Sequence, residues 1–141
     1  MSDFLEAALL RHCFRNTAMP SPPATLYLAL FTGGVPNDAG GGATECSAGN
    51  YARLALTTGT SGTGAGSVFN DPGSTAGIVT NAANIDEPTD SGADWGTITG
   101  WALFDAASSG NMWFRGDVPS TAISVGDILR FIAAQLSVTV G

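Results

Sequence analysis

The side chains best suited to catalysis lie next to each other near the N-terminus. His12, the one histidine in the sequence, stands beside Cys13, and these residue types can form a base and a nucleophile. As neighbours on a helix they point about 100° apart, so they cannot act as a catalytic dyad. A Gly-x-Ser-x-Gly nucleophile motif is also missing. We therefore interpret His12 as structural, and no catalytic residue is predicted.

A glycine-rich stretch at 59–66 invites comparison with a phosphate-binding loop. Its spacing differs from the dinucleotide-binding fingerprint, and no helix is expected after it. A P-loop also needs a lysine, and the sequence has none. The stretch is predicted to be a flexible surface loop, and no cofactor is expected.

Four acidic residues, Asp86, Glu87, Asp90 and Asp94, could gather around Ca²⁺, which prefers several oxygen ligands. Their spacing fits no EF-hand loop, so we predict a solvated acidic loop and keep a bound ion as the alternative. A zinc site is excluded because two cysteines and one histidine supply three ligands without a Cys-x-x-Cys pair. No metal site is predicted.

Three tryptophans, Trp95, Trp101 and Trp113, fall in or beside one predicted hairpin. Trp101 and Trp113 could stack on a sugar, but packing in the core or in a subunit interface is the commoner role of large aromatic side chains. No pair of carboxylates with acid/base geometry accompanies them, so a glycosidase is not supported.

One helix is predicted, over residues 1–16. Asp3 and Glu6 have the spacing of a capping box, and Asn16 is expected to end the helix. Its apolar stripe consists of Leu5, Leu9, Leu10, Cys13 and Phe14. Because three turns are marginal alone in water, this stripe is expected to lie on a sheet or on a neighbouring subunit.

The rest of the chain predicts strands joined by glycine-rich loops. Residues 25–32 are apolar on both faces, as in a strand covered on both sides, and residues 51–58 alternate, with Arg53 facing outward. A loop is expected at 33–50, a hairpin at 97–115 and a final strand at 127–140. These elements predict an all-β, β-sandwich or jelly-roll-like domain over 1–141, with the helix in 1–16 and strands and loops in 25–141.

The charge pattern limits the partners. The formal net charge is −7, and the five basic residues are scattered arginines, so nucleic acid is not an expected partner. A membrane is not expected either, since no apolar run approaches the roughly 20 residues of a spanning helix. The acidic N-terminus is not typical of a signal peptide, which indicates synthesis in the cytoplasm with reduced cysteines, a single disulfide being the alternative.

Several motifs occur in an order and spacing known from one protein family. They are Leu-Glu-Ala-Ala-Leu-Leu at 5–10, Asn-Thr-Ala at 16–18, Pro-Ala-Thr-Leu-Tyr-Leu-Ala-Leu-Phe-Thr at 23–32, Glu45 with Tyr-Ala-Arg at 51–53, Trp-Gly-Thr-Ile-Thr at 95–99 and Leu-Phe-Asp-Ala at 103–106 before Gly-Asn at 110–111. With these motifs the chain resembles small virion proteins of tailed bacteriophages. Members are labelled as tail-fibre or as head decoration (cement) proteins. The resemblance implies a virion component with a β-sandwich fold and no enzymatic activity.

The sequence favours a place on the phage head over one in the tail. A fibre shaft needs a heptad or fibrous repeat, which the sequence lacks, whereas a cement protein needs a compact domain with an apolar element to bury at a subunit seam. We predict a non-enzymatic capsid decoration protein on the capsid exterior, a homotrimer that bridges copies of the major capsid protein. A tail-fibre or baseplate adaptor or tip module is the alternative. The expected interface residues are Leu5, Leu9, Phe14, Trp101 and Trp113.

Overall fold

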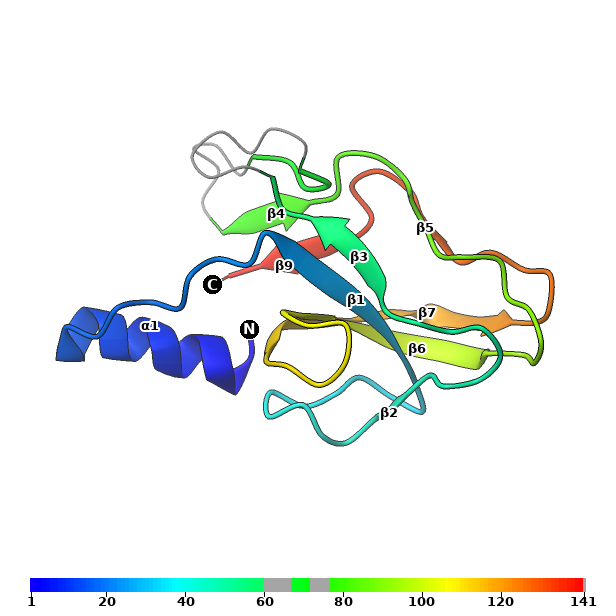
Figure 1. The fold of residues 1–141 in the computed structure, drawn as a ribbon, viewed down its shortest axis with the longest axis horizontal. Helices are drawn as coiled ribbons and strands as arrows, with labels where there is room; N and C mark the ends of the chain where they lie inside the picture. The colour runs from blue at the N-terminus through cyan, green and yellow to red at the C-terminus, as the bar shows by residue number, and fades with distance from the viewer. Residues whose placement is uncertain (60–66, 72–76, 141) are drawn as a thin grey trace.

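The computed structural model describes residues 1–59, 67–71 and 77–140. Helix α1 spans Asp3–Arg15 (Figure 1). The strands are β1 (Thr25–Thr32), β2 (Thr44–Glu45), β3 (Leu54–Thr57), β4 (Ile78–Thr80), β5 (Ile85–Asp86), β6 (Gly96–Phe104), β7 (Met112–Ile123), β8 (Arg130–Phe131) and β9 (Ser137–Thr139). The prediction of a mainly β fold with one N-terminal helix is confirmed.

β1 is the centre of the main sheet. It pairs antiparallel with β6 on one side and with both β2 and β3 on the other, and β7 extends the sheet beyond β6. Leu28 and Leu30 are buried on one face of β1, and Ala29 and Phe31 on the other. The strand is therefore covered on both sides, as its uninterrupted apolar run predicts.

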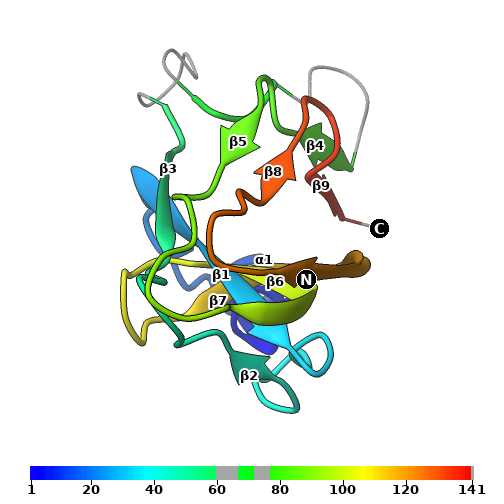
Figure 2. The ribbon, with the colours of Figure 1, turned by 90° about the vertical axis from the view of Figure 1, so that its right-hand side faces the viewer.

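Two short ribbons, β4–β9 and β5–β8, form a second layer over one face of the main sheet (Figure 2). The larger core cluster joins the layers, since it contains Leu28 and Leu103 from the sheet and Phe131 and Val138 from the ribbons. This layered arrangement buries the apolar face that each element could not cover alone.

The prediction of one continuous strand over 127–140 is wrong. The chain turns between β8 and β9, and the buried Asn81 organises this turn. Its amide nitrogen donates to the Ile132 carbonyl at 2.9 Å, and its Oδ1 accepts from the Leu136 amide at 2.8 Å. These hydrogen bonds take the place of strand pairing for backbone groups in the turn.

β6 and β7 form the predicted hairpin, although β7 runs further than residue 115. In the connecting loop, Asp105 accepts hydrogen bonds from the Asn111 amide at 2.7 Å and the Asn111 side chain at 2.8 Å. Gly110 has a φ of +79°, and a Cβ there would lie 2.5 Å from the Asp105 carboxylate. The loop therefore requires glycine at this position.

Three further predictions concern the loops and the strand between residues 33 and 66. The loop at 33–50 contains the two-residue strand β2, and the strand expected at 51–58 is shorter, as β3. The glycine-rich stretch predicted at 59–66 lies outside the described residues, apart from Gly59.

Candidate functional site

The N-terminal arm, defined as residues 3–24, consists of α1 and the segment that returns from it to β1. Its base is fixed by Ser2, whose hydroxyl accepts a hydrogen bond from the Leu5 amide at 3.3 Å and donates one to the Met112 carbonyl. The predicted capping box of Asp3 and Glu6 is therefore wrong, because Ser2 is the N-cap. The expected end of the helix at Asn16 is confirmed, with a left-handed φ of 52°.

Replacing Ser2 with alanine is expected to lower the free energy of unfolding by about 1–2 kcal/mol, the usual cost of losing an N-cap. The change also leaves the buried Met112 carbonyl without this donor. Denaturant titration measures the effect, with Ser120→Ala as the control, since Ser120 is exposed on β7. Equal stability of the two variants would show that the hydroxyl does not hold the arm.

Beyond its base the arm projects from the body into solvent (Figure 1). Residues 9–18 are all exposed, whereas Leu5 and Ala8 are buried. Of the two covers expected for the apolar stripe, a sheet or a neighbouring subunit, the body of the same chain covers only Leu5 at the base of the stripe. Leu10 is 58% exposed and Phe14 is 79% exposed. For this part of the stripe, a neighbouring subunit is the remaining expected cover.

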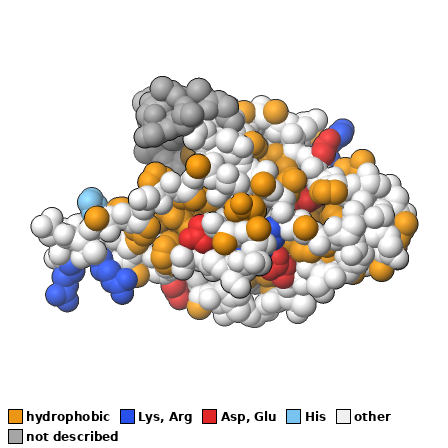
Figure 3. All heavy atoms as spheres, in the orientation of Figure 1, with side chains coloured by type: hydrophobic (Ala, Val, Ile, Leu, Met, Phe, Trp, Pro, Cys, Tyr) orange, Lys and Arg blue, Asp and Glu red, His pale blue; other side chains and the backbone are white. Residues whose placement is uncertain are grey.

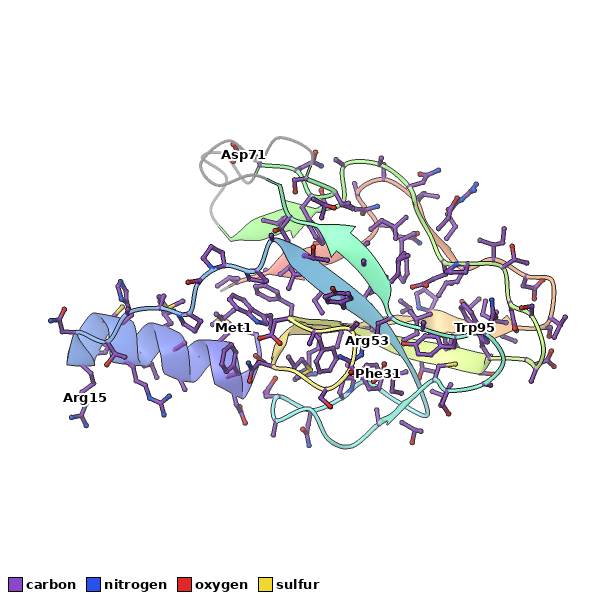
Figure 4. The ribbon with its side chains drawn as sticks, viewed as in Figure 1. Met1, Arg15, Phe31, Arg53, Asp71 and Trp95 are labelled. Atoms are coloured by element: carbon purple, nitrogen blue, oxygen red, sulfur yellow. The ribbon has the colours of Figure 1, made fainter. Side chains whose placement is uncertain are left out.

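Positive charge gathers on the arm (Figure 3). Arg53, Arg115 and Arg130 are each ion-paired within the body. Arg11 and Arg15 are exposed, and among the described residues no ion pair is formed by either. Figure 4 shows Arg15 at the end of the molecule opposite Trp95. The arm therefore presents cations beside apolar side chains on an otherwise acidic protein.

An apolar groove of about 770 Å³ lies between the main sheet and the β4–β9 ribbon. Its apolar lining residues are Leu26, Phe69, Ile78, Val79, Leu103, Phe114, Val138 and Val140. Asp71 is the one charged side chain among the described lining residues. The sequence offered no signal for this groove, because its walls come from segments far apart in the chain.

Arg53 lies at the centre of a polar network in the body (Figure 4). Its Nε and Nη2 donate to the two carboxylate oxygens of Glu45, each at 2.8 Å, and its guanidinium carbon lies 3.8 Å from the Phe104 ring centroid. Its Nη1 donates to the Ser109 carbonyl at 2.8 Å. The Tyr51 hydroxyl joins by donating to Glu45 at 3.2 Å. The side chain of Arg53 is 7% exposed, so the outward orientation predicted for it is wrong.

The acidic segment 86–94, predicted to be a solvated loop, is solvated only in part, since Asp86 and Asp94 are exposed. Glu87 is 2% exposed and Asp90 is also buried. Asp90 Oδ2 accepts from the Trp95 amide at 3.0 Å. Both carboxyl oxygens of Glu87 and the indole nitrogen of Trp95 are buried, and within the described part of the chain they have no hydrogen-bond partner. Burial raises the pKa of Glu87 from 4.5 to about 8, because the charged form loses its hydration there.

Comparison with known proteins places the chain in a family. The family model described as podophage GP4 fiber I protein gp80 matches residues 1–139. The chain belongs to this family. It is therefore a member of a phage virion protein family, as its resemblance implies. No curated protein matches the chain.

The motifs that carry this family resemblance supply much of the network just described. Tyr51 and Arg53 both donate hydrogen bonds to Glu45, and the Arg53 guanidinium also binds the loop that Asp105 organises. In this gp80 family member, polar side chains that could suggest a reactive site are therefore engaged in holding the fold. The signal in the sequence for the Glu45–Arg53 pair was an acidic and a basic side chain eight residues apart.

The five predicted interface residues divide into two groups. Leu9 and Phe14 are exposed on the arm, whereas Leu5, Trp101 and Trp113 are buried within the chain. Trp101 packs against Gly116, where a Cβ would lie 2.6 Å from the indole, and Trp113 lies 5.7 Å from the Phe4 ring between centroids. Their role in contacts with other proteins remains a prediction. Neither buried indole offers a face to a sugar, so the sugar-stacking alternative is not supported.

Two other kinds of site, a metal site and a membrane-spanning helix, are not found in the described part of the chain. Across 1–59, 67–71 and 77–140, no group of three or more metal-ligating side chains comes together. In the same part of the chain, no helix is long and apolar enough to cross a membrane.

Proposed function

We propose that this chain is a non-enzymatic structural subunit of a podophage fibre. The observation that carries the proposal is the match of the gp80 family model, a fiber I protein by its description, to residues 1–139. The chemistry of the described residues supports it, since the charged network around Arg53 stabilises loops and strands.

The subunit acts by contacting other virion proteins and covering part of their surface. The exposed apolar and cationic part of the arm is the surface best suited to contact other virion proteins, since exposed apolar side chains rimmed by charge are typical of interaction sites. Further copies of this chain are among the proposed partners. Such contacts would let a short chain without a fibrous repeat contribute to a long structure.

Capsid decoration is the second candidate function. The compact β layers, the formal net charge of −7 and the projecting arm suit a protein that binds outside a DNA-filled shell. In this form the chain, as a homotrimer, bridges copies of the major capsid protein and buries the arm at a subunit seam.

Quantitative mass spectrometry of purified particles distinguishes the two functions. A fibre subunit is expected in far fewer copies than the major capsid protein, and a gene deletion should lower adsorption to the host while leaving the heat resistance of the head unchanged. Copies in proportion to the capsid protein, with heat-sensitive heads in the deletion, would favour decoration. A chain absent from purified particles would contradict both.

A further inference from the structure

We propose that the outer face of the arm seats in the apolar groove of a second copy of this chain. The outer face is defined as Leu9, Leu10, Cys13 and Phe14. The inference rests on the proposed function as an assembly subunit and adds the two surfaces that meet and the copy that each belongs to.

The outer face has the spacing of a helical contact surface. Leu9 and Cys13 are four residues apart, as are Leu10 and Phe14, so these side chains form one patch. The patch lies on the distal half of α1, beyond the buried Leu5 and Ala8. Burying an apolar patch of this kind, so that water no longer contacts it, is favourable in free energy.

The groove offers a matching surface. Leu103 and Val138 are buried at its floor, while Ile78 and Val140 are exposed, at 46% and 44%. A helix that lays side chains of this spacing into an apolar groove is a recurrent mode of recognition. The volume of about 770 Å³ accommodates several large side chains.

Charge complementarity points to a second copy as the occupant. Arg11 and Arg15 stand beside the outer face, and among the described residues neither forms an ion pair. Residues 17–141 contain ten acidic residues and three arginines, so the body has a formal charge of −7 while residues 1–16 sum to zero. The two arginines on the distal half of the arm and the acidic body attract each other between copies, in addition to the apolar contact.

The arm does not fill its own groove, since its distal half projects into solvent (Figure 1). Contact between two outer faces alone would bury only four side chains from each copy, whereas stable interfaces bury about 800 Å² per partner. Each chain carries one arm and one groove. When each arm binds in the groove of another copy, the outer face and the groove are therefore both buried.

The test begins with the purified full chain and the double variant L10S/F14S. Both side chains are exposed, so the fold should be retained, and circular dichroism checks this. Sedimentation analysis should show oligomers for the wild type and at least about a hundredfold weaker association for the variant, from the lost apolar burial. The matched control V125S/I132S removes two exposed apolar side chains elsewhere and should associate like the wild type.

A groove variant separates this contact from the pairing of two arms. Ile78→Lys places a cation at the groove rim, opposite the arm arginines, and should also give monomers. Mixing it with L10S/F14S should restore a heterodimer, because one protein keeps an intact arm and the other an intact groove. Oligomers of Ile78→Lys alone, no complementation in the mixture, or a monomeric wild type would each overturn the proposal.

These outcomes are separate from those of the proposed function. A chain found in the fibre whose self-association ignores the arm variants would refute the arm-in-groove contact alone. A chain missing from particles would refute the proposed function, whatever the purified protein does.

Discussion

Replacing Arg53 with methionine is expected to lower the free energy of unfolding by about 2–4 kcal/mol, somewhat less than the cost of removing one partner of a fully buried ion pair, because the Glu45 side chain is 29% exposed. The variant leaves Glu45 without the guanidinium that binds both its oxygens. It also removes donors from the Ala106 and Ser109 carbonyls and the cation over the Phe104 ring. Methionine keeps the apolar stem, so the loss reports on the polar contacts.

Arg130→Met is the matched control for this prediction. Arg130 pairs with Asp86, but its side chain is 52% exposed, and exposed ion pairs contribute about 0–1 kcal/mol. Urea unfolding of both variants measures the difference. If Arg53→Met were as stable as Arg130→Met, the network around Arg53 would not be a major support of the fold.

Glu87→Gln is expected to abolish a fall in stability as the pH rises. The pKa of Glu87 is about 8 in the folded protein against 4.5 as its ordinary value. Between these values the unfolded chain releases its proton first, so the stability contributed by Glu87 is complete below about pH 4.5 and is lost as the pH approaches 8. The wild type should lose about 3–5 kcal/mol across this window, at about 1.4 kcal/mol per pH unit.

The surroundings of Glu87 explain why its charge finds no compensation. The nearby Tyr51 phenol has a pKa raised by burial and further by the negative charges of Glu45 and Glu87. Arg53 is engaged with Glu45. Ionised Glu87 therefore has no cation in contact among the described residues.

Unfolding free energies of the wild type, Glu87→Gln and Asp117→Asn, measured from about pH 5 to about pH 9, test this prediction. Asp117 is an exposed carboxylate on β7, so its variant should retain the decline of the wild type. The Glu87→Gln protein should show a flat profile by comparison. An identical slope in all three proteins would mean that Glu87 ionises freely in the folded state.

The parts of the fold set by local pattern were predictable from the sequence. The double-sided apolar run of β1, the aromatic runs of the hairpin and the end of α1 at Asn16 each depend on residues close together in the chain. The ends of β8 and β9 were not, because Asn81 positions their turn from about fifty residues away in sequence. Local alternation cannot reveal that constraint.

The candidate site was only partly predictable for the same reason. Helical spacing singled out Leu9 and Phe14, yet it could not show that α1 buries its base alone and leaves its distal half exposed. The acidity of the 86–94 segment indicated a solvated loop, whereas tertiary packing buries Glu87 and Asp90. Composition predicts average exposure, and these two carboxyls depart from that average.

A cryo-electron microscopy map of the intact particle is the most direct test of the central claim that this chain is a structural part of the virion. We expect density for the β layers outside the DNA-filled shell, in ordered contact with neighbouring virion proteins. Infectious particles whose map accounts for every protein without this chain would contradict it.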